Sequence, residues 1–410
     1  MRSRCHAILR AVQDGVSPHF SVHLDKLDDA AERVARVTLA RYPTLDIPFH
    51  SRWRHFEAGG VDRKAELDRL LAGRSADDVA RAHIDLTVVS VLLDAGAGPQ
   101  WQYSEPGAEG MDGKPSSYSR SEGLAVASFR AFIEGRFSAH ADDPCRADAA
   151  VLARVDASVL RSVFQVTPNN TMVGLEGRAA LVAALGATLQ AEAAATGSSG
   201  GGTARPGLLW DRLVHGPGGR PASVSAARVL AELLALMAPI WTSGSRVQGL
   251  PGGDVWPHLW AGASTVAGND PTTSGWVPFH KLSQWMTYSL LEPLQWAGLP
   301  VTHVDGLTGL PEYRNGGLLL DTGVIVPRRP ATTRVWKPAD PFIIEWRALT
   351  VALLDLLAER VRIKLDKTAD ELPLACILEG GTWAAGREIA AELREGGAPP
   401  LKIDSDGTVF

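Results

Sequence analysis

Apolar residues recur at three- and four-residue spacing through most of this chain, and this pattern limits the possible folds more than any other feature. Such spacing places apolar side chains along one face of an α-helix. The segments that show it are 28–42, 75–96, 146–165, 175–195, 223–241, 279–298, 340–361 and 381–397. The sequence therefore predicts a mostly α protein.

Residues at the ends of these segments support the helical interpretation. Ser75 is followed three residues later by Asp78, which fits a capping box with Asp in place of the usual Glu or Gln. Gly96 is a suitable helix stop. Pro341 stands near the start of its segment, where proline is tolerated, whereas Pro293 lies inside 279–298 and predicts a kink.

Strand signals are few. Residues 317–327 and 401–410 each suggest a short β-hairpin, the second turning at Asp406-Gly407. The glycine- and serine-rich segment 196–207 suggests a flexible linker or loop. It would separate an N-terminal helical part, 1–195, from a tryptophan-rich C-terminal part, 208–410.

Composition narrows the functional classes. The 410 residues carry a net charge of −5, so we expect no general attraction to nucleic acid or to an anionic membrane. Three well-separated cysteines suggest free thiols in a reducing compartment. The start of the chain becomes polar too early for a signal peptide, and no 18-residue apolar run is present. These features predict a cytoplasmic protein.

The familiar nucleotide, hydride-transfer and metalloprotease motifs are absent. One GxSxG match, at 197–201, lies in the glycine-rich segment and is interpreted as chance. The stretch "LDAGAGPQW" (93–101), which contains Asp94, either shapes a pocket wall or contacts a phosphate. Arg178, at a predicted helix start, has the same two interpretations: capping with Glu176 nearby, or phosphate binding.

The stretch "PFHSRWRHF" (48–56) holds two histidines among arginines and a tryptophan. His50 and His55 are five residues apart, a poor spacing for metal ligands on a helix. Two interpretations remain, a basic aromatic lid over an anionic substrate and a surface whose arginines extend into solvent. We expect no metal and no cofactor.

Lys281 and Glu312 are the strongest candidates for chemistry. Lys281 begins a strongly apolar predicted helix, where a lysine needs a carboxylate partner or a lowered pKa. Glu312 stands in "LPEYRNGG", where a proline and two glycines predict a loose turn that could aim it into a cavity. The two could act as acid and base at a reacting carbon, or form a structural ion pair between a helix and a loop.

Several stretches resemble the uracil-catabolism family, long known as a domain of unknown function. They are "IPFHSRWRHFE", "SVLLDAGAGPQWQY", "GLEGR" and "FHKLSQW…GLTGLPEYRNGGLLLDTGVI…FIIEWRALTV". The likeness therefore spans nearly the whole chain. It implies a role in a route that degrades uracil through a ribosylated intermediate.

The C-terminal part also resembles, more distantly, the queuosine-nucleotide N-glycosidases, which look like helix-hairpin-helix DNA glycosylases. The matching letters are Phe279, Lys281, Gln284, Tyr313, Arg314, Glu345, Arg347 and Ala348. Glu312 stands where that family has aspartate, which puts the detailed role of the carboxylate in doubt. This likeness implies an all-α fold of the DNA-glycosylase kind, with Lys281 and Glu312 facing one active site.

These resemblances lead to the hypothesis of an N-glycosidase acting on a ribosylurea-like nucleoside or its 5′-phosphate, with a small-molecule substrate and no nucleic acid. Glu312 would stabilise the oxocarbenium-like sugar, and Lys281 would steer Glu312 or protonate the leaving nitrogen. Tyr313 and Arg314 would hold the sugar or phosphate, and Trp276 and His280 would wall the leaving group. Asp321, Glu345 and Arg347 would support them from behind.

Two alternatives remain at this point. A phosphoribosyl transferase would make the nucleotide, but the sequence lacks an acidic pair opening a phosphate loop after a strand. A non-catalytic nucleotide-binding sensor would bind the same ligand without turnover.

Overall fold

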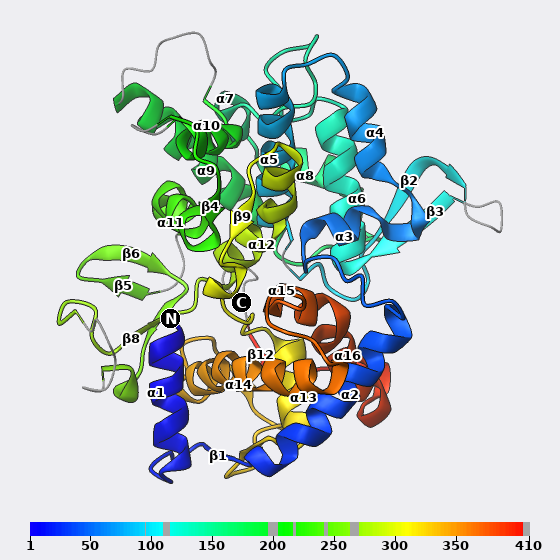
Figure 1. Ribbon diagram of the computed structural model, residues 1–410. Helices are drawn as coiled ribbons and strands as arrows, with labels where there is room; N and C mark the ends of the chain where they lie inside the picture. The colour runs from blue at the N-terminus through cyan, green and yellow to red at the C-terminus, as the bar shows by residue number, and fades with distance from the viewer. Residues whose placement is uncertain are drawn as a thin grey trace.

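The computed structural model describes residues 1–94, 96–109, 115–195, 204–215, 219–241, 245–262 and 270–404. These residues form a mostly helical molecule with short strand pairs (Figure 1), which confirms the predicted fold class. None of the described helices is both long and apolar enough to cross a membrane. The predicted linker falls largely on residues outside these ranges, as does the GxSxG match at 197–201.

The α-helices are α1 (Arg2–Gln13), α2 (Leu27–Arg41), α3 (Arg52–Phe56), α4 (Arg63–Leu70), α5 (Ala76–Leu92), α6 (Arg120–Ile133), α7 (Ala149–Leu152), α8 (Ala157–Val163), α9 (Leu175–Ala195), α10 (Leu209–Val214), α11 (Ala226–Met237), α12 (Lys281–Trp296), α13 (Tyr313–Asp321), α14 (Pro341–Leu365), α15 (Leu374–Ile377) and α16 (Trp383–Leu393). A π-helical turn, Leu378–Thr382, joins α15 to α16.

The strands form two-stranded sheets only, within the described part of the chain. The antiparallel pairs are β1 (Phe20–Val22) with β10 (Ile325–Pro327), β2 (Gln102–Glu109) with β3 (Pro115–Ser119), β5 (Ser245–Val247) with β6 (Leu250–Gly253), and β7 (Val255–Pro257) with β8 (Trp276–Pro278). The parallel pairs are β4 (Val224–Ser225) with β9 (Val301–Thr302), and β11 (Val335–Trp336) with β12 (Lys402–Ile403).

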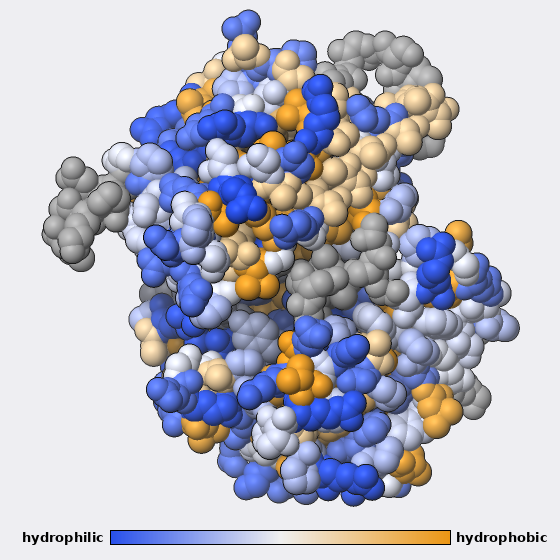
Figure 2. Space-filling model, turned by 180° about the vertical axis from the view of Figure 1, so that it is seen from behind, coloured by the Kyte–Doolittle hydropathy of each residue, from blue (hydrophilic) through white to orange (hydrophobic). Residues whose placement is uncertain are grey.

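The beginning and the end of the chain pack together. Helices α1 and α2 both lie on α14, and α16 packs on α13 in the same lower part of the molecule (Figure 1). The helices from α3 to α12 form the upper part, where α12 lies against α5 and α11, while strands β5 to β8 lie at the side near α1 (Figure 1). One continuous cluster of buried apolar side chains includes residues from both parts. The surface seen from behind is largely hydrophilic, with a broad apolar area on the side of α9 and α11 (Figure 2).

The glycines after Glu312 were predicted to give a loose turn, followed by a hairpin over 317–327, and both predictions are wrong. Gly316 and Gly317 lie inside α13, and β10 pairs with β1, which is distant in sequence. A Cβ on Gly316 would lie 2.6 Å from the ring of Trp346, whose Nε1 donates to the Gly316 carbonyl at 3.1 Å. Gly316 therefore allows α13 to pack closely against Trp346 of α14.

The structure also differs from the hairpin predicted over 401–410. β12 pairs in parallel with β11, and the expected turn at Asp406-Gly407 lies outside the described residues. The long helix expected over 146–165 is divided into α7 and α8, because Asp156 caps a new helix by accepting the Val159 N–H at 2.9 Å. Helix α12 continues through Pro293 to Trp296.

Candidate functional site

The starts of α12 and α13 meet at a cavity of about 490 Å³. Its lining comes from distant segments, including the loops around Asp94 and His50, the first residues of α6, and residues 396–401. Lys281 and Glu312 both belong to this lining. The two residues singled out from the sequence therefore lie in one cavity, of a size suited to a small-molecule ligand. We call it the reaction cavity.

Lys281 is the first residue of α12, and the buried carboxylate of Asp254 fixes its position. Asp254 Oδ2 accepts the backbone N–H of Lys281 at 3.1 Å. The Asp254 backbone carbonyl accepts the N–H groups of Phe279 and His280, at 2.9 and 3.2 Å. Burial lowers the pKa of Lys281, and the charge of Glu312 opposes this shift. Lys281 can therefore lose or donate a proton more readily than a lysine in water.

Glu312 is the N-cap of α13, and its side chain folds back onto the first turn of its own helix. Oε2 accepts the Arg314 N–H at 2.7 Å, and Oε1 accepts the Asn315 N–H at 2.5 Å. Each oxygen of an ionised carboxylate can accept two hydrogen bonds, so one position on each remains for a ligand or water. The side chain is thus aimed by its own backbone.

Burial raises the pKa of the Glu312 carboxyl, while the two backbone N–H groups and the charge of Lys281 oppose the rise. The positive end of α13 also favours the ionised form. Burial therefore drives Lys281 and Glu312 toward their neutral forms, and each keeps the other charged. Opposed shifts of this kind are typical of an acid and base pair, although structural ion pairs also produce them.

Tyr313 and Arg314 lie beside Glu312 in the reaction cavity. Tyr313 is 40% exposed, and the Arg314 guanidinium lies over its ring at 4.9 Å from the centroid. Arg314 Nη1 donates to the carbonyl of Gly397 at 3.0 Å. This bond ties the C-terminal segment to the cavity wall.

Asp94 also lines the reaction cavity, and Arg178 does not. Asp94 forms an ion pair with the fully buried Arg52 at 3.0 Å, so Arg52 does not belong to a solvent-exposed arginine face. Arg178 is buried behind the same loop, where its Nε donates to the Leu93 carbonyl at 3.0 Å. Burial lowers its pKa to about 10. Arg178 therefore supports the loop from behind and lies outside the reaction cavity.

His50 and His55 both line the reaction cavity. His50 Nδ1 lies 2.9 Å from Oε2 of Glu379, a residue of the π-helical turn. The pKa of Glu379 falls to about 2, because hydrogen bonding to His50 and the nearby cations outweigh its burial. Burial lowers the pKa of His55 to about 4, so this imidazole is neutral at pH 7.

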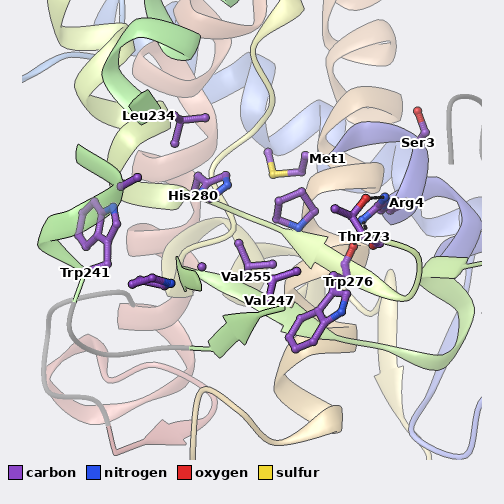
Figure 3. Close-up of a pocket in the computed structure, with 14 residues that line it drawn as sticks. Met1, Ser3, Arg4, Leu234, Trp241, Val247, Val255, Thr273, Trp276 and His280 are labelled. Atoms are coloured by element: carbon purple, nitrogen blue, oxygen red, sulfur yellow. Dashed lines mark hydrogen bonds between the residues drawn. The ribbon is translucent and has the colours of Figure 1, made fainter. Parts of the chain in front are cut away.

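Trp276 and His280 were predicted to line the part of the site that holds the leaving group. The structure places both outside the reaction cavity. They line a second cavity of about 500 Å³, together with Trp241 and Arg4 (Figure 3). His280 has a left-handed backbone with φ of 45°, and it connects β8 to α12. The chain changes direction there, so His280 and Lys281 line different cavities.

Asp321, Glu345 and Arg347 line neither cavity. Asp321 pairs with Arg394. Glu345 accepts from the hydroxyl of Ser17 at 2.5 Å. Arg347 acts on Lys281 indirectly. Its guanidinium donates to both oxygens of Asp254, at 2.6 and 2.7 Å, and Asp254 in turn holds the start of α12.

The protein-family comparison covers the whole chain. Residues 1–410 match the model described as "Protein of unknown function (DUF1688)". The chain belongs to this family. The chain is 37% identical to "Protein urg3" of Schizosaccharomyces pombe, over 100% of this chain and 96% of that relative. It is also 37% identical to "Uracil catabolism protein 4" of Lachancea kluyveri, over 97% of this chain and 93% of the relative. The resemblance to the uracil-catabolism family is thus confirmed.

The residues of the reaction cavity that were not singled out from the sequence include Arg120, Trp285 and Trp383. Trp285 follows Lys281 by one helical turn, and the i, i+4 spacing could have placed it beside the lysine. Trp383 begins α16, and no pattern in the neighbouring sequence indicates that its side chain faces the cavity. Arg120 opens α6 with φ of 54°, a conformation that sequence patterns do not reveal.

Proposed function

We propose that this protein acts in uracil catabolism as an N-glycosidase, hydrolysing a ribosylurea-like nucleoside or its 5′-phosphate to sugar and urea or a ureido fragment. The pathway part rests on the 37% identity to a relative named for uracil catabolism. The reaction part rests on one observation, the presence of Lys281 and Glu312 in a single cavity with pKa values shifted in opposite directions.

The proposed reaction needs one proton acceptor and one proton donor. The C1′–N bond breaks, its electron pair goes to the urea nitrogen, and that nitrogen takes a proton from Lys281. A water oxygen forms the new bond to C1′ and gives a proton to Glu312. Before water adds, the carboxylate of Glu312 stabilises the positive charge of the oxocarbenium-like sugar. Transfer of a proton from Glu312 back to Lys281 restores the starting state.

The remaining lining suits a flat, polar leaving group. Trp285 and Leu310 supply apolar walls to the cavity. Trp285 Nε1 and His55 Nδ1 are buried and make no hydrogen bond within the described part of the chain. Burying a donor or acceptor without a hydrogen-bond partner costs free energy. The amide groups of a ureido fragment would supply partners for both atoms.

The test is urea release from ribosylurea 5′-phosphate by the purified protein. Glu312→Gln should lower the rate by about 10²–10⁴-fold, the usual contribution of a general base. Lys281→Met should also lower it strongly. A matched control is Glu371→Gln, because Glu371 is a glutamate that also accepts a backbone N–H, from Thr368 at 2.9 Å, but it does not line the cavity.

Full activity in Glu312→Gln would contradict the assignment of the base. Tight nucleotide binding without any sugar release in the wild-type protein would support the sensor alternative. Formation of the N-glycosidic bond from an activated sugar phosphate, with no hydrolysis, would support the transferase alternative.

A further inference from the structure

A strongly basic pocket, distinct from the cavity lined by Trp276 and His280, adjoins the reaction cavity. It has a volume of about 500 Å³ and shares Arg120, Arg314, Gly396 and Gly397 with the reaction cavity. Its remaining lining comes from the end of α16, including Arg387, Arg394 and Glu392. A ligand in the reaction cavity can therefore extend into this pocket. We call it the arginine pocket.

Arg314 is the buried wall between the two spaces. The residue is only 6% exposed, and its Nη1 donates to the carbonyl of Gly397. Its Nε is buried and donates to no acceptor of the described residues. An unfilled donor on a buried cation is costly, and an anionic oxygen would remove that cost.

Arg120 and Arg387 are exposed, and neither forms an ion pair with a carboxylate of the described ranges. Arg387 lies over the ring of Trp383 at 5.6 Å from the centroid, which limits its freedom without neutralising it. Arg120 is held in the left-handed conformation at the start of α6, where Ser119 provides no side-chain cap. Arg120 and Ser121 line the reaction cavity, so the positive end of α6 lies at this cavity.

The charges that line the arginine pocket do not cancel. Arg394 is neutralised by Asp321, and Glu392 is held by Arg33 at 2.8 and 2.9 Å. Arg120, Arg314 and Arg387 remain, against Glu395 alone. The pocket therefore carries an excess of positive charge in a protein whose net charge is negative.

We propose that Arg120, Arg314 and Arg387 bind the 5′-phosphate of the substrate, so that the substrate is a phosphomonoester and not the free nucleoside. This inference rests on the proposed function, because it takes the sugar to lie in the reaction cavity. Arg314 and Glu312 are two residues apart at the start of α13. Glu312 lines the reaction cavity and Arg314 lines both spaces, so a ribose whose C1′ faces Glu312 can place its 5′ phosphate beside Arg314. Planar guanidinium groups suit the oxygens of a phosphate dianion.

Calorimetric binding of the reaction product tests the inference without any need for turnover. Ribose 5-phosphate should bind to the wild-type protein more tightly than either ribose or inorganic phosphate, because it alone fills both spaces. Arg120→Gln and Arg387→Gln should each weaken its binding by about 10- to 100-fold, as expected for the loss of one charged hydrogen-bonding partner. Ribose binding should stay unchanged in Arg387→Gln, because Arg387 lines the arginine pocket and not the reaction cavity.

Arg161→Gln is the matched control, since Arg161 is an exposed arginine of α8 that lines neither space. Both test arginines are exposed, and the variants should fold, which circular dichroism would verify. Equal affinity for ribose and ribose 5-phosphate would overturn the inference. Inorganic phosphate binding as tightly as ribose 5-phosphate would also overturn it. So would Arg120→Gln and Arg387→Gln variants whose affinity for ribose 5-phosphate lies within twofold of the wild-type affinity. Phosphate-dependent binding without urea release would overturn the proposed reaction and leave the phosphate site standing.

Discussion

The buried pair of Arg347 and Asp254 holds the start of α12, and breaking it should cost far more than breaking a similar pair at the surface. The perturbation is Asp254→Asn. Asp254 is 6% exposed and Arg347 is 1% exposed, with both carboxylate oxygens bound to the guanidinium. The substitution removes the negative charge and one acceptor, and leaves the arginine charge buried without compensation.

The expected magnitude follows from these contacts. Removing one partner of a buried ion pair usually lowers the free energy of unfolding by about 3–5 kcal/mol. The same oxygens also accept from Trp256 Nε1 at 2.7 Å and from the Lys281 N–H, so the start of α12 loses its support as well. The surface comparison is Glu392→Gln, which breaks a pair with Arg33 of the same two-bond geometry. Exposed pairs contribute about 1 kcal/mol or less.

Urea denaturation followed by far-ultraviolet circular dichroism would measure both variants. Asp254→Asn should lower the denaturation midpoint much more than Glu392→Gln, with similar dependence on urea concentration. The activity of the folded Asp254→Asn variant should also fall, because Lys281 is displaced. Equal destabilisation by the two substitutions would refute the reasoning from burial.

Two further outcomes are expected. Gly316→Ala should lower the free energy of unfolding by about 1–3 kcal/mol, since its Cβ would lie 2.6 Å from Trp346, whereas Gly317→Ala, 3.3 Å from Pro400, should be close to neutral in the same denaturation assay. Burial lowers the pKa of His55 to about 4, and the unfolded value is near 6.5, so the unfolded chain binds the proton more readily between these values. The free energy of unfolding should therefore fall as the pH drops from 6.5 to 4, and His55→Asn should reduce that dependence. The same pH dependence of the free energy of unfolding in His55→Asn and in the wild type would contradict this reasoning.

The helices were predictable because their signals are local. Ser75 caps α5 as predicted, with its hydroxyl accepting the Asp78 N–H at 3.1 Å, and α12 and α14 begin within two residues of the predicted segments. Residues 313–321 were not predictable as helix, because two glycines there disfavour one locally. Their helix depends on packing against Trp346, a tertiary contact that no local pattern reveals.

The candidate site was predictable only where residue chemistry and the family resemblance agreed. Lys281 and Glu312 were found because a lysine on an apolar helix and a glutamate in a short turn are unusual. Trp276 and His280 were predicted to lie at the same site as Lys281, and the structure places them in another cavity. The backbone reversal at His280 separates them from Lys281, and the sequence gives no sign of it. Arg120 and Arg387 reach the site only through the tertiary fold.

The most direct test of the central claim is a crystal structure of the Glu312→Gln variant with ribosylurea 5′-phosphate bound. The account predicts that C1′ lies between the side chains of residues 312 and 281, with the phosphate against Arg314. A sugar seated instead in the cavity lined by Trp241 and Trp276, away from both residues, would contradict it.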